Sequence, residues 1–203
     1  MLILCDIGNT SYHFLDSKGD YKKDVNSFDP SNIKEKIYYI CVNPKVKIVL
    51  ESLNNWIDLT NKVDISNYYE TMGVDRIFAC ESIQNGVIID AGSAITVDVV
   101  KDGVFEGGFI YPGVRAMGES YKRISSALDY EFNFSLHLDK LPKNSQDSIS
   151  YGYLKLLYNE VISYDMPIYL TGGDAKEFAK IFPNAEVDEL LLFKGMKKVM
   201  QTL

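Results

Sequence analysis

Hydrophobic residues along this chain form short strand-like runs that alternate with stretches of helical periodicity. Residues 37–42 have the length and the apolar content of a buried strand, and residues 87–100 contain two β-branched runs on either side of residues 90–93, which predicts strand, tight glycine turn and strand. Residues 45–56 and 148–164 instead carry apolar side chains at the spacing of amphipathic helices. Alternation of the two patterns is typical of α/β proteins. We therefore predict an α/β fold.

The remaining elements follow from the same patterns and from glycine and proline turn signals. Further strands are predicted at 2–5, 11–15, 107–113, 167–171 and 190–193. Further helices are predicted at 76–84, 114–128, 175–182 and 194–201. Residues 17–20 are predicted to be a turn, and residues 129–143 have no clear periodicity.

One stretch of the sequence occurs twice. Residues 2–15 and 87–100 align without a gap, which places Asp6 on Asp90, Gly8 on Gly92 and Asn9 on Ser93. A repeat of this length predicts two similar halves rather than a solenoid. The three strands and one helix at the start are typical of a ribonuclease-H-like lobe. We predict two such lobes, residues 1–84 and 85–203, with a nucleotide cleft between them.

Each repeat contains an Asp-x-Gly bend after an apolar strand. Glycine lets backbone N–H groups approach a phosphate, and Asp6 would bind a magnesium ion or the waters of that ion. A single bend of this kind is common in hairpins that have no function. The pair, together with a third glycine-rich strand end at residues 171–174, favours a nucleotide site with an adenosine pocket.

Residues 73–76, Gly-Val-Asp-Arg, begin a predicted helix. The simple interpretation is a helix N-terminus with a solvated neighbour. The functional interpretation makes Asp75 the general base for an acceptor hydroxyl and Arg76 the cation for an anionic substrate or for the moving phosphoryl group. Tyr69 is close enough in sequence to contact the same substrate, although ordinary packing explains it equally well.

Composition narrows the class of protein. The 203 residues are 46% hydrophobic and 24% charged, as in a soluble globular protein, and no apolar run reaches the roughly 18 residues of a membrane span. We expect a cytoplasmic protein without a membrane partner. The net charge of −7 argues against a nucleic-acid partner. The three cysteines lack the spacing of a zinc site, so we expect buried, reduced thiols.

Five motifs occur in the order found in a known family. They are Asp6-Ile7-Gly8-Asn9-Thr10, Gly73-Val74-Asp75-Arg76, Asp90-Ala91-Gly92-Ser93-Ala94-Ile95-Thr96-Val97-Asp98, Gly107-Gly108-Phe109-Ile110-Tyr111-Pro112-Gly113 and Thr171-Gly172-Gly173-Asp174. In these motifs the chain resembles the type III pantothenate kinases, members of the superfamily of actin-like proteins, sugar kinases and heat-shock-protein ATPases. The resemblance covers nearly the whole chain.

The resemblance implies ATP-dependent phosphorylation of pantothenate at its primary hydroxyl, the first step of coenzyme A synthesis, by a homodimer with substrate pockets near the subunit interface. It implies Asp75 as the proton acceptor and Asp90 as the ligand of a monovalent cation, K⁺ or NH₄⁺. The implied ATP-binding residues are Asp6, Ile7, Gly8, Asn9, Thr10, Ser11, Tyr12, His13, Ser93, Gly172 and Gly173. The implied pantothenate-binding residues are Tyr69, Gly73, Val74, Asp75, Arg76 and Ser145.

The chain departs from the family pattern at several positions. Ser93 and Ser145 stand where threonine is usual, and each keeps the hydroxyl. Val74 stands where alanine is frequent, and the short chain leaves Tyr68 as an alternative to Tyr69. Two other functions stay open: a kinase for another small hydroxy acid, and a nucleotide-binding regulatory protein of the same fold, which would need no base.

Overall fold

The computed structural model describes residues 2–201 and divides into two compact units. One unit comprises Met1–Ile83 with Leu190–Leu203, and the other comprises Gln84–Glu189. The sequence led us to expect lobes of residues 1–84 and 85–203. The difference lies in the last helix, which packs on a helix of the first unit and therefore belongs to that unit by its contacts.

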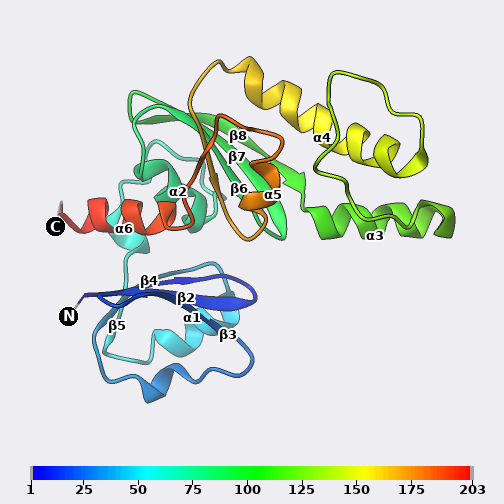
Figure 1. Ribbon diagram of the computed structural model, residues 1–203. Coiled ribbons are helices and arrows are strands. Elements are labelled where there is room, and N and C mark those ends of the chain that lie inside the picture. The colour runs from blue at the N-terminus through cyan, green and yellow to red at the C-terminus, as the bar shows by residue number, and fades with distance from the viewer. Residues whose placement is uncertain (1, 202–203) are drawn as a thin grey trace. The chain divides into compact units, whose positions relative to one another are not determined.

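The first unit is built on a five-stranded mixed sheet in the order β3-β2-β1-β4-β5 (Figure 1). Strands β1, β2 and β3 are antiparallel neighbours, whereas β4 and β5 continue the sheet in parallel. The strands are β1 (Ile3–Ile7), β2 (Ser11–Asp16), β3 (Gly19–Asp24), β4 (Ile37–Cys41) and β5 (Trp56–Asp58). The helices are α1 (Pro44–Leu50), α2 (Val74–Glu81) and α6 (Leu191–Gln201).

Both faces of this sheet are covered, because successive side chains of a strand point to opposite faces. Cys5 and Phe14 pack on one face with Leu50 of α1 and with Trp56. Leu4 lies on the other face, in a cluster that α2 and α6 complete. The latter cluster consists of Leu4, Ile40, Leu59, Val74, Phe78, Phe193, Met196 and Val199. The first sheet is thus the middle layer of its unit.

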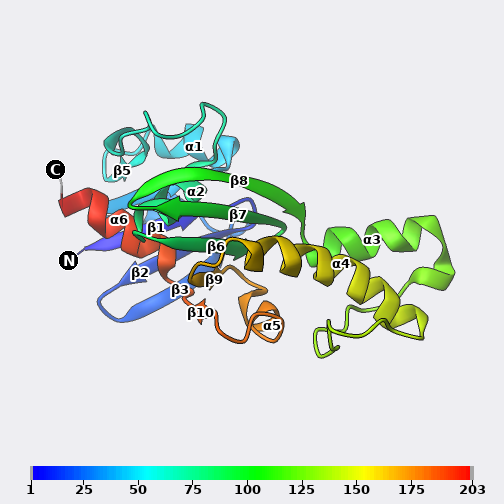
Figure 2. The same ribbon diagram turned by 90° about the horizontal axis from the view of Figure 1, so that it is seen from above.

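The second unit has a sheet of the order β10-β9-β6-β7-β8 (Figure 2). Its strands are β6 (Gly86–Ala91), β7 (Ala94–Lys101), β8 (Val104–Pro112), β9 (Ile168–Thr171) and β10 (Glu186–Val187). Its helices are α3 (Val114–Ile124), α4 (Ser145–Ser163) and α5 (Ala175–Phe178). One face of the sheet, with Ile89, Val97 and Leu170, packs against α4 and α5 in a single apolar core.

The predicted α/β class is confirmed, and the local errors have identifiable causes. The helix expected at 45–56 ends at Leu50, and Trp56 begins β5, a strand too short to show a pattern. Residues 17–20 include the start of β3, an exposed strand whose mostly polar residues show no apolar alternation. Residues 190–193 are not a strand, because the Leu-Leu-Phe run belongs to the first turn of α6.

Two predicted helices also differ in length or continuity. The helix expected at 114–128 ends at Ile124 and gives way to a 3-10 helix at Ser126–Leu128. The helix expected at 175–182 is regular only at Ala175–Phe178. The three cysteines, Cys5, Cys41 and Cys80, are free and buried as expected. Among residues 2–201, no helix has both the length and the apolarity to cross a membrane.

Candidate active site

The first Asp-x-Gly bend joins β1 to β2. Ile7 pairs with Tyr12 across the hairpin, and the Gly8 N–H donates to the Ser11 carbonyl at 3.0 Å. Asp6 lies directly opposite His13, so the two side chains share one face of the sheet. This face is the one covered by α2 and α6 further along the strands. The bend therefore places Asp6 near the carboxyl end of β1, the central strand of the first sheet.

The second bend joins β6 to β7 and is one residue shorter than the first. Ala91 pairs with Ile95, and the Gly92 N–H donates to the Ala94 carbonyl at 3.2 Å. Asp90 consequently faces Thr96, not Val97 as a gapless alignment requires. The repeat is real up to the bend but shifts by one residue after it.

Asp90 is surrounded by oxygen atoms from three strands. Its direct neighbours are Thr96 on β7 and Thr171 on β9, on the same face of the sheet. Gly172 follows Thr171 with a φ of +90°, and a β-carbon there would overlap Asp90 Oδ1 and lie 2.7 Å from the Ala91 carbonyl oxygen. Only glycine satisfies both this backbone conformation and this contact.

Two polar residues on this face escaped the sequence analysis. Thr96 Oγ1 is buried and makes no hydrogen bond to any described residue. Asp98 is 1% exposed and lies opposite Ile88, on the same face as Asp90. The signal was available: positions 96 and 98 are polar at a spacing of two in an otherwise apolar strand, which indicates a polar stripe on one face.

The glycine-rich strand end at residues 171–174 is tied to the second bend. The Asp174 N–H donates to the Ala91 carbonyl at 2.9 Å. Burial, with a smaller effect of Glu177, raises the pKa of the Asp174 carboxyl. On the opposite side of the bend, a β-carbon on Gly113 would overlap the Ser93 carbonyl and lie 2.7 Å from that of Gly92. Glycines from two other segments thus pack directly against the bend.

The Gly73–Arg76 motif is the start of α2 in the first unit. The Arg76 N–H donates to Asp75 Oδ1 at 2.8 Å, which holds the carboxylate over the first turn of the helix. A β-carbon on Gly73 would lie 2.5 Å from the same oxygen, so glycine makes room for it. Burial raises the pKa of the Asp75 carboxyl, although the Arg76 hydrogen bond and charge oppose this. A carboxylate with a raised pKa is a better proton acceptor.

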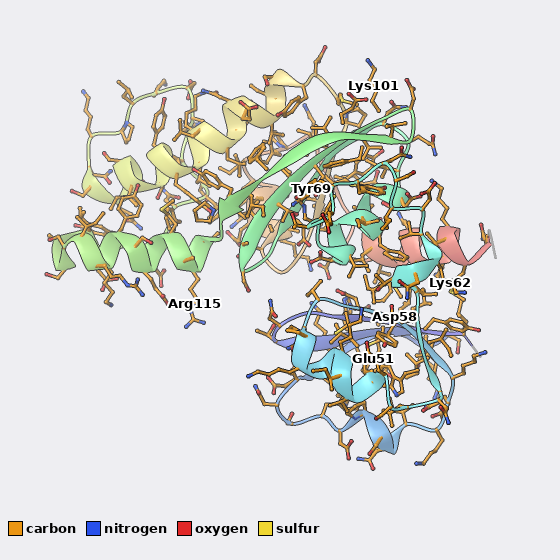
Figure 3. The ribbon with its side chains drawn as sticks, turned by 180° about the vertical axis from the view of Figure 1, so that it is seen from behind. Glu51, Asp58, Lys62, Tyr69, Lys101 and Arg115 are labelled. Carbon is orange, nitrogen blue, oxygen red and sulfur yellow. The ribbon has the colours of Figure 1, made fainter. Side chains whose placement is uncertain are left out.

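Arg76 is 6% exposed and pairs with Tyr69 in the segment before the helix. Its Nη1 donates to the Tyr69 hydroxyl, and its guanidinium carbon lies 5.7 Å from the centre of the Tyr69 ring. Tyr69 itself, which is labelled in Figure 3, is exposed, with 45% of its surface accessible to solvent. Tyr68 instead donates its hydroxyl to Glu81 Oε1 at 2.9 Å. Of the two tyrosines, Tyr69 is therefore the one joined to the Asp75–Arg76 pair.

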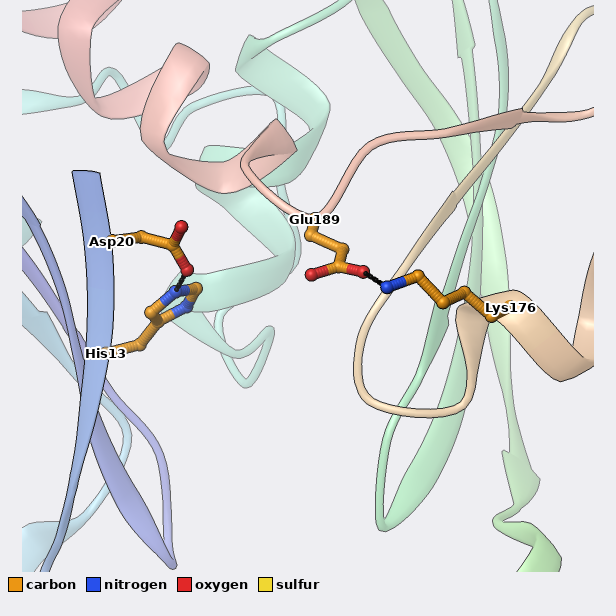
Figure 4. A network of polar contacts seen from close by, with 4 residues as sticks. All are labelled: His13, Asp20, Lys176 and Glu189. Atoms are coloured by element: carbon orange, nitrogen blue, oxygen red, sulfur yellow. Dashed lines mark hydrogen bonds and ion pairs between the residues drawn. The ribbon is translucent and has the colours of Figure 1, made fainter.

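Residues 6–13 do not all direct their side chains to one place. The Ile7 and Tyr12 side chains are buried in the core between the first sheet and α1, so they can offer a ligand only backbone atoms. His13 points to the opposite face, where its Nε2 lies 2.9 Å from Asp20 Oδ2 (Figure 4). The hydrogen bond from His13 lowers the pKa of the Asp20 carboxyl.

Ser145 is the first residue of α4, behind an Asn144 side chain that accepts the Asp147 N–H at 2.9 Å. Figures 1 and 2 both show this end of α4 beside α3, beyond the edge of the second sheet. Ser145 is exposed there, away from the bend that carries Asp90. Within the second unit, Ser145 and Asp90 therefore belong to separate places.

The two sheets, each with an Asp-x-Gly bend after its central strand, define the fold of the actin-like ATPases and sugar kinases. A solved candidate 2-dehydro-3-deoxygalactonokinase from Sinorhizobium meliloti has this fold, with a TM-score of 0.57 at 9% identity over 100% of this chain and 97% of that one. A family model described as type III pantothenate kinase matches residues 35–164. The chain belongs to the type III pantothenate kinase family.

Individual relatives extend this match to nearly the whole chain. The type III pantothenate kinase of Sulfurimonas denitrificans is 64% identical over 200 residues, 98% of each protein. A solved structure from Campylobacter jejuni, described as a candidate Baf family transcriptional activator, is 38% identical with a TM-score of 0.90, over 99% of this chain and 98% of that one. The family name states a kinase that acts on pantothenate.

Proposed function

We propose that this protein transfers the γ-phosphoryl group of ATP to the primary hydroxyl of pantothenate, the first step of coenzyme A synthesis. The observation that carries the proposal is the match to type III pantothenate kinases at 64% identity over 98% of the chain. Because ATP is the phosphoryl donor, we infer that the enzyme works in the cytoplasm.

In this proposal Asp75 accepts the proton of the attacking hydroxyl. Its half-buried carboxylate with a raised pKa supports the role, since a base with a pKa nearer to neutrality takes up a proton more readily. Arg76, Tyr69, Gly73 and Val74 form the pantothenate site around it. The buried guanidinium of Arg76 supplies the positive charge that the carboxylate of pantothenate requires.

The nucleotide phosphates bind at the two Asp-x-Gly bends. Residues 6–13 supply backbone N–H groups and short polar side chains, and Asp6 binds Mg²⁺ through the waters of the ion. Within the second unit, Ser93, Gly172 and Gly173 are the proposed ATP-binding residues. The bound magnesium would neutralise charge on the transferring phosphoryl group.

A monovalent cation, K⁺ or NH₄⁺, binds at Asp90. The donor set supports this choice: one carboxylate, the buried hydroxyl of Thr96 and a nearby backbone carbonyl. Such oxygen donors with a single charge suit a weakly hydrated monovalent ion.

The enzyme acts as a homodimer that uses the surface of α3 and the end of α4. None of the residues of α3 is buried, and Ile124 and Leu141 nearby are 72% and 78% exposed. Exposed apolar residues at this density favour a protein contact. Ser145 at the start of α4 reaches pantothenate through this assembly. Sedimentation of the wild type and of Ile124→Glu tests the contact. The wild type should be a dimer and the variant should dissociate, whereas a monomeric wild type would contradict the proposal.

A coupled assay of ADP release tests the reaction. Purified protein with ATP and Mg²⁺ is expected to release ADP only when pantothenate is added, and faster in KCl than in NaCl. Other small hydroxy acids serve as competing substrates. If the protein phosphorylates one of these acids but not pantothenate, that acid is the substrate. If the rate of ADP release does not depend on any added hydroxy acid, the proposed kinase activity is contradicted.

A regulatory role is the second candidate, because the Campylobacter jejuni structure is described as a candidate transcriptional activator. A sensor needs nucleotide binding but no base, and the net charge of −7 disfavours a DNA partner. Protein that binds ATP, retains its fold and turns over no hydroxy acid would favour this role.

A further inference from the structure

Two consecutive tyrosines attach the segment of residues 65–73 to opposite ends of α2. The Tyr69 hydroxyl accepts from Arg76 in the first turn of the helix. The Tyr68 hydroxyl donates to Glu81 Oε1 at 2.9 Å, and Glu81 is the last residue of the helix. The segment that carries Tyr69 and Gly73 is therefore held along the helix by side chains at both ends.

The backbone of the segment is held by short-range hydrogen bonds, and most of its side chains are exposed. The Tyr68 N–H donates to the Ile65 carbonyl at 3.0 Å, the Met72 N–H to the Tyr69 carbonyl at 2.9 Å and the Ser66 N–H to Asp64 Oδ1 at 3.0 Å, and the Gly73 carbonyl accepts from the Ile77 N–H at 3.2 Å. Of its large apolar side chains, Ile65 is 60% exposed and only Met72 is buried. Local turns and one buried side chain leave a segment weakly ordered, so the tyrosine contacts matter more here than they would in a core.

Glu81, in contrast, is firmly placed. Lys198 of α6 donates its Nζ to the Glu81 carbonyl at 2.8 Å, which satisfies one of the carbonyls left open at the end of α2. The two helices approach closely at Gly195, where a β-carbon would lie 2.8 Å from the carbonyl carbon of Phe78. The hydrogen-bond acceptor of Tyr68 therefore lies on a rigid helix pair.

We propose that Glu81 is a positioning residue for the pantothenate site, which acts through Tyr68. The carboxylate forms a charge-assisted hydrogen bond with the phenol, a stronger bond than one between neutral groups. It thereby keeps residues 65–73 ordered before substrate arrives, so that binding does not have to order them. The proposal rests on the proposed function, because it takes Tyr69 and Gly73 as part of the acceptor site.

The first test compares Glu81→Ala, Glu81→Gln and the wild type. Glu81→Ala removes the acceptor and is expected to raise the KM for pantothenate roughly fivefold to twentyfold, with the KM for ATP and kcat within about twofold of the wild type. Glu81→Gln keeps an acceptor oxygen and should recover most of the affinity. Glu70→Ala is the matched control, since Glu70 is an exposed carboxylate in the same segment.

The second test uses Tyr68→Phe, which removes only the hydroxyl and so avoids damage to α2. Tyr68→Phe should reproduce the effect of Glu81→Ala, and the double variant should be no worse than either single one. Hydrogen exchange of amides 65–73 should be faster in both, without pantothenate present.

Three results would overturn the proposal: an unchanged KM for pantothenate in Glu81→Ala, an equal rise in the KM for ATP, or additive effects in the double variant. Failure of the proposed function is distinguishable from all three, because the wild type itself would then not phosphorylate pantothenate. If Glu81→Ala does not fold, Tyr68→Phe and its exchange rates decide the question.

Discussion

Gly172 touches the carboxylate of Asp90 so closely that a β-carbon at residue 172 would overlap Asp90 Oδ1. Gly172 also has a φ of +90°, a backbone conformation that residues with a side chain rarely adopt. The contact locks the end of β9 onto the second bend, and it explains why glycine stands immediately after Thr171. The Asp90 carboxylate, which we propose as a cation ligand, and the backbone of the third glycine-rich motif are therefore one structural unit.

Gly172→Ala should lower the melting temperature and weaken ATP binding. Backbone strain and the overlap with Asp90 together cost about 1–3 kcal/mol, or roughly 2–10 °C for a chain of this size. Gly173→Ala is the matched control for the fold, because a β-carbon there meets nothing within 4 Å. Thermal unfolding of both variants checks this, and equal melting temperatures would contradict the account.

Asp75→Asn should abolish most of the turnover without loss of stability. Removal of a general base lowers kcat about 10²-fold to 10⁴-fold. The pKa of Asp75 is raised in the folded state, so its charge costs folding free energy at neutral pH, and that cost vanishes as pH falls below the ordinary pKa of aspartate. Asparagine carries no charge, so the melting temperature at pH 7 should equal or exceed that of the wild type.

The same shift predicts the pH profile of the wild type. Asp75 must be ionised to accept a proton, so kcat/KM should fall as pH drops through its pKa. The raised pKa places this acid limb above the ordinary aspartate value. A limb at or below pH 3.8 would assign the base to another residue. Steady-state rates between pH 4 and 8, in proteins shown to stay folded, provide the measurement.

Arg76→Lys should raise the KM for pantothenate although it keeps the charge. The guanidinium is buried, donates to the Tyr69 hydroxyl and stacks near the ring, whereas a lysine has one ammonium group for these contacts. We expect a loss of about 1–3 kcal/mol, or roughly fivefold to 150-fold in kcat/KM. Tyr69→Phe removes only the hydroxyl and should have a smaller effect. Equal rates in Arg76→Lys and the wild type would contradict the assignment.

The sequence predicted what local patterns encode. The β-branched runs around Gly8 and Gly92 identify both hairpins, because strand alternation and turn glycines are local signals. The shift between Asp6–His13 and Asp90–Thr96 was missed, although the alternation of side chains carries it. In the gapless alignment the buried Tyr12 and Phe14 fall on the polar Thr96 and Asp98, which is the phase change that a turn shorter by one residue produces.

Long-range contacts explain the rest of what was missed. Glu81 lies 13 residues from Tyr68 in sequence, and nothing local indicates that they are hydrogen-bonded. The Leu-Leu-Phe run at 191–193 is ambiguous by itself, because short apolar runs suit strands and buried helices alike. Packing on α2 makes it helical and assigns α6 to the first unit. Such contacts join residues that are far apart in the sequence, so local sequence patterns do not predict them.

The close approach of α6 to α2 makes a prediction that reverses the usual effect of glycine in helices. Replacing a helical glycine with alanine normally stabilises a protein by about 1 kcal/mol. Gly195 lies in α6, where a β-carbon would overlap the Phe78 carbonyl oxygen and lie 2.8 Å from its carbon, so Gly195→Ala should instead destabilise by about 1–3 kcal/mol. Gly152 is exposed in α4 with nothing within 4 Å, so Gly152→Ala should stabilise. Urea unfolding of the two variants checks the opposite signs, and stabilisation by both would mean that α6 does not pack on α2 this closely.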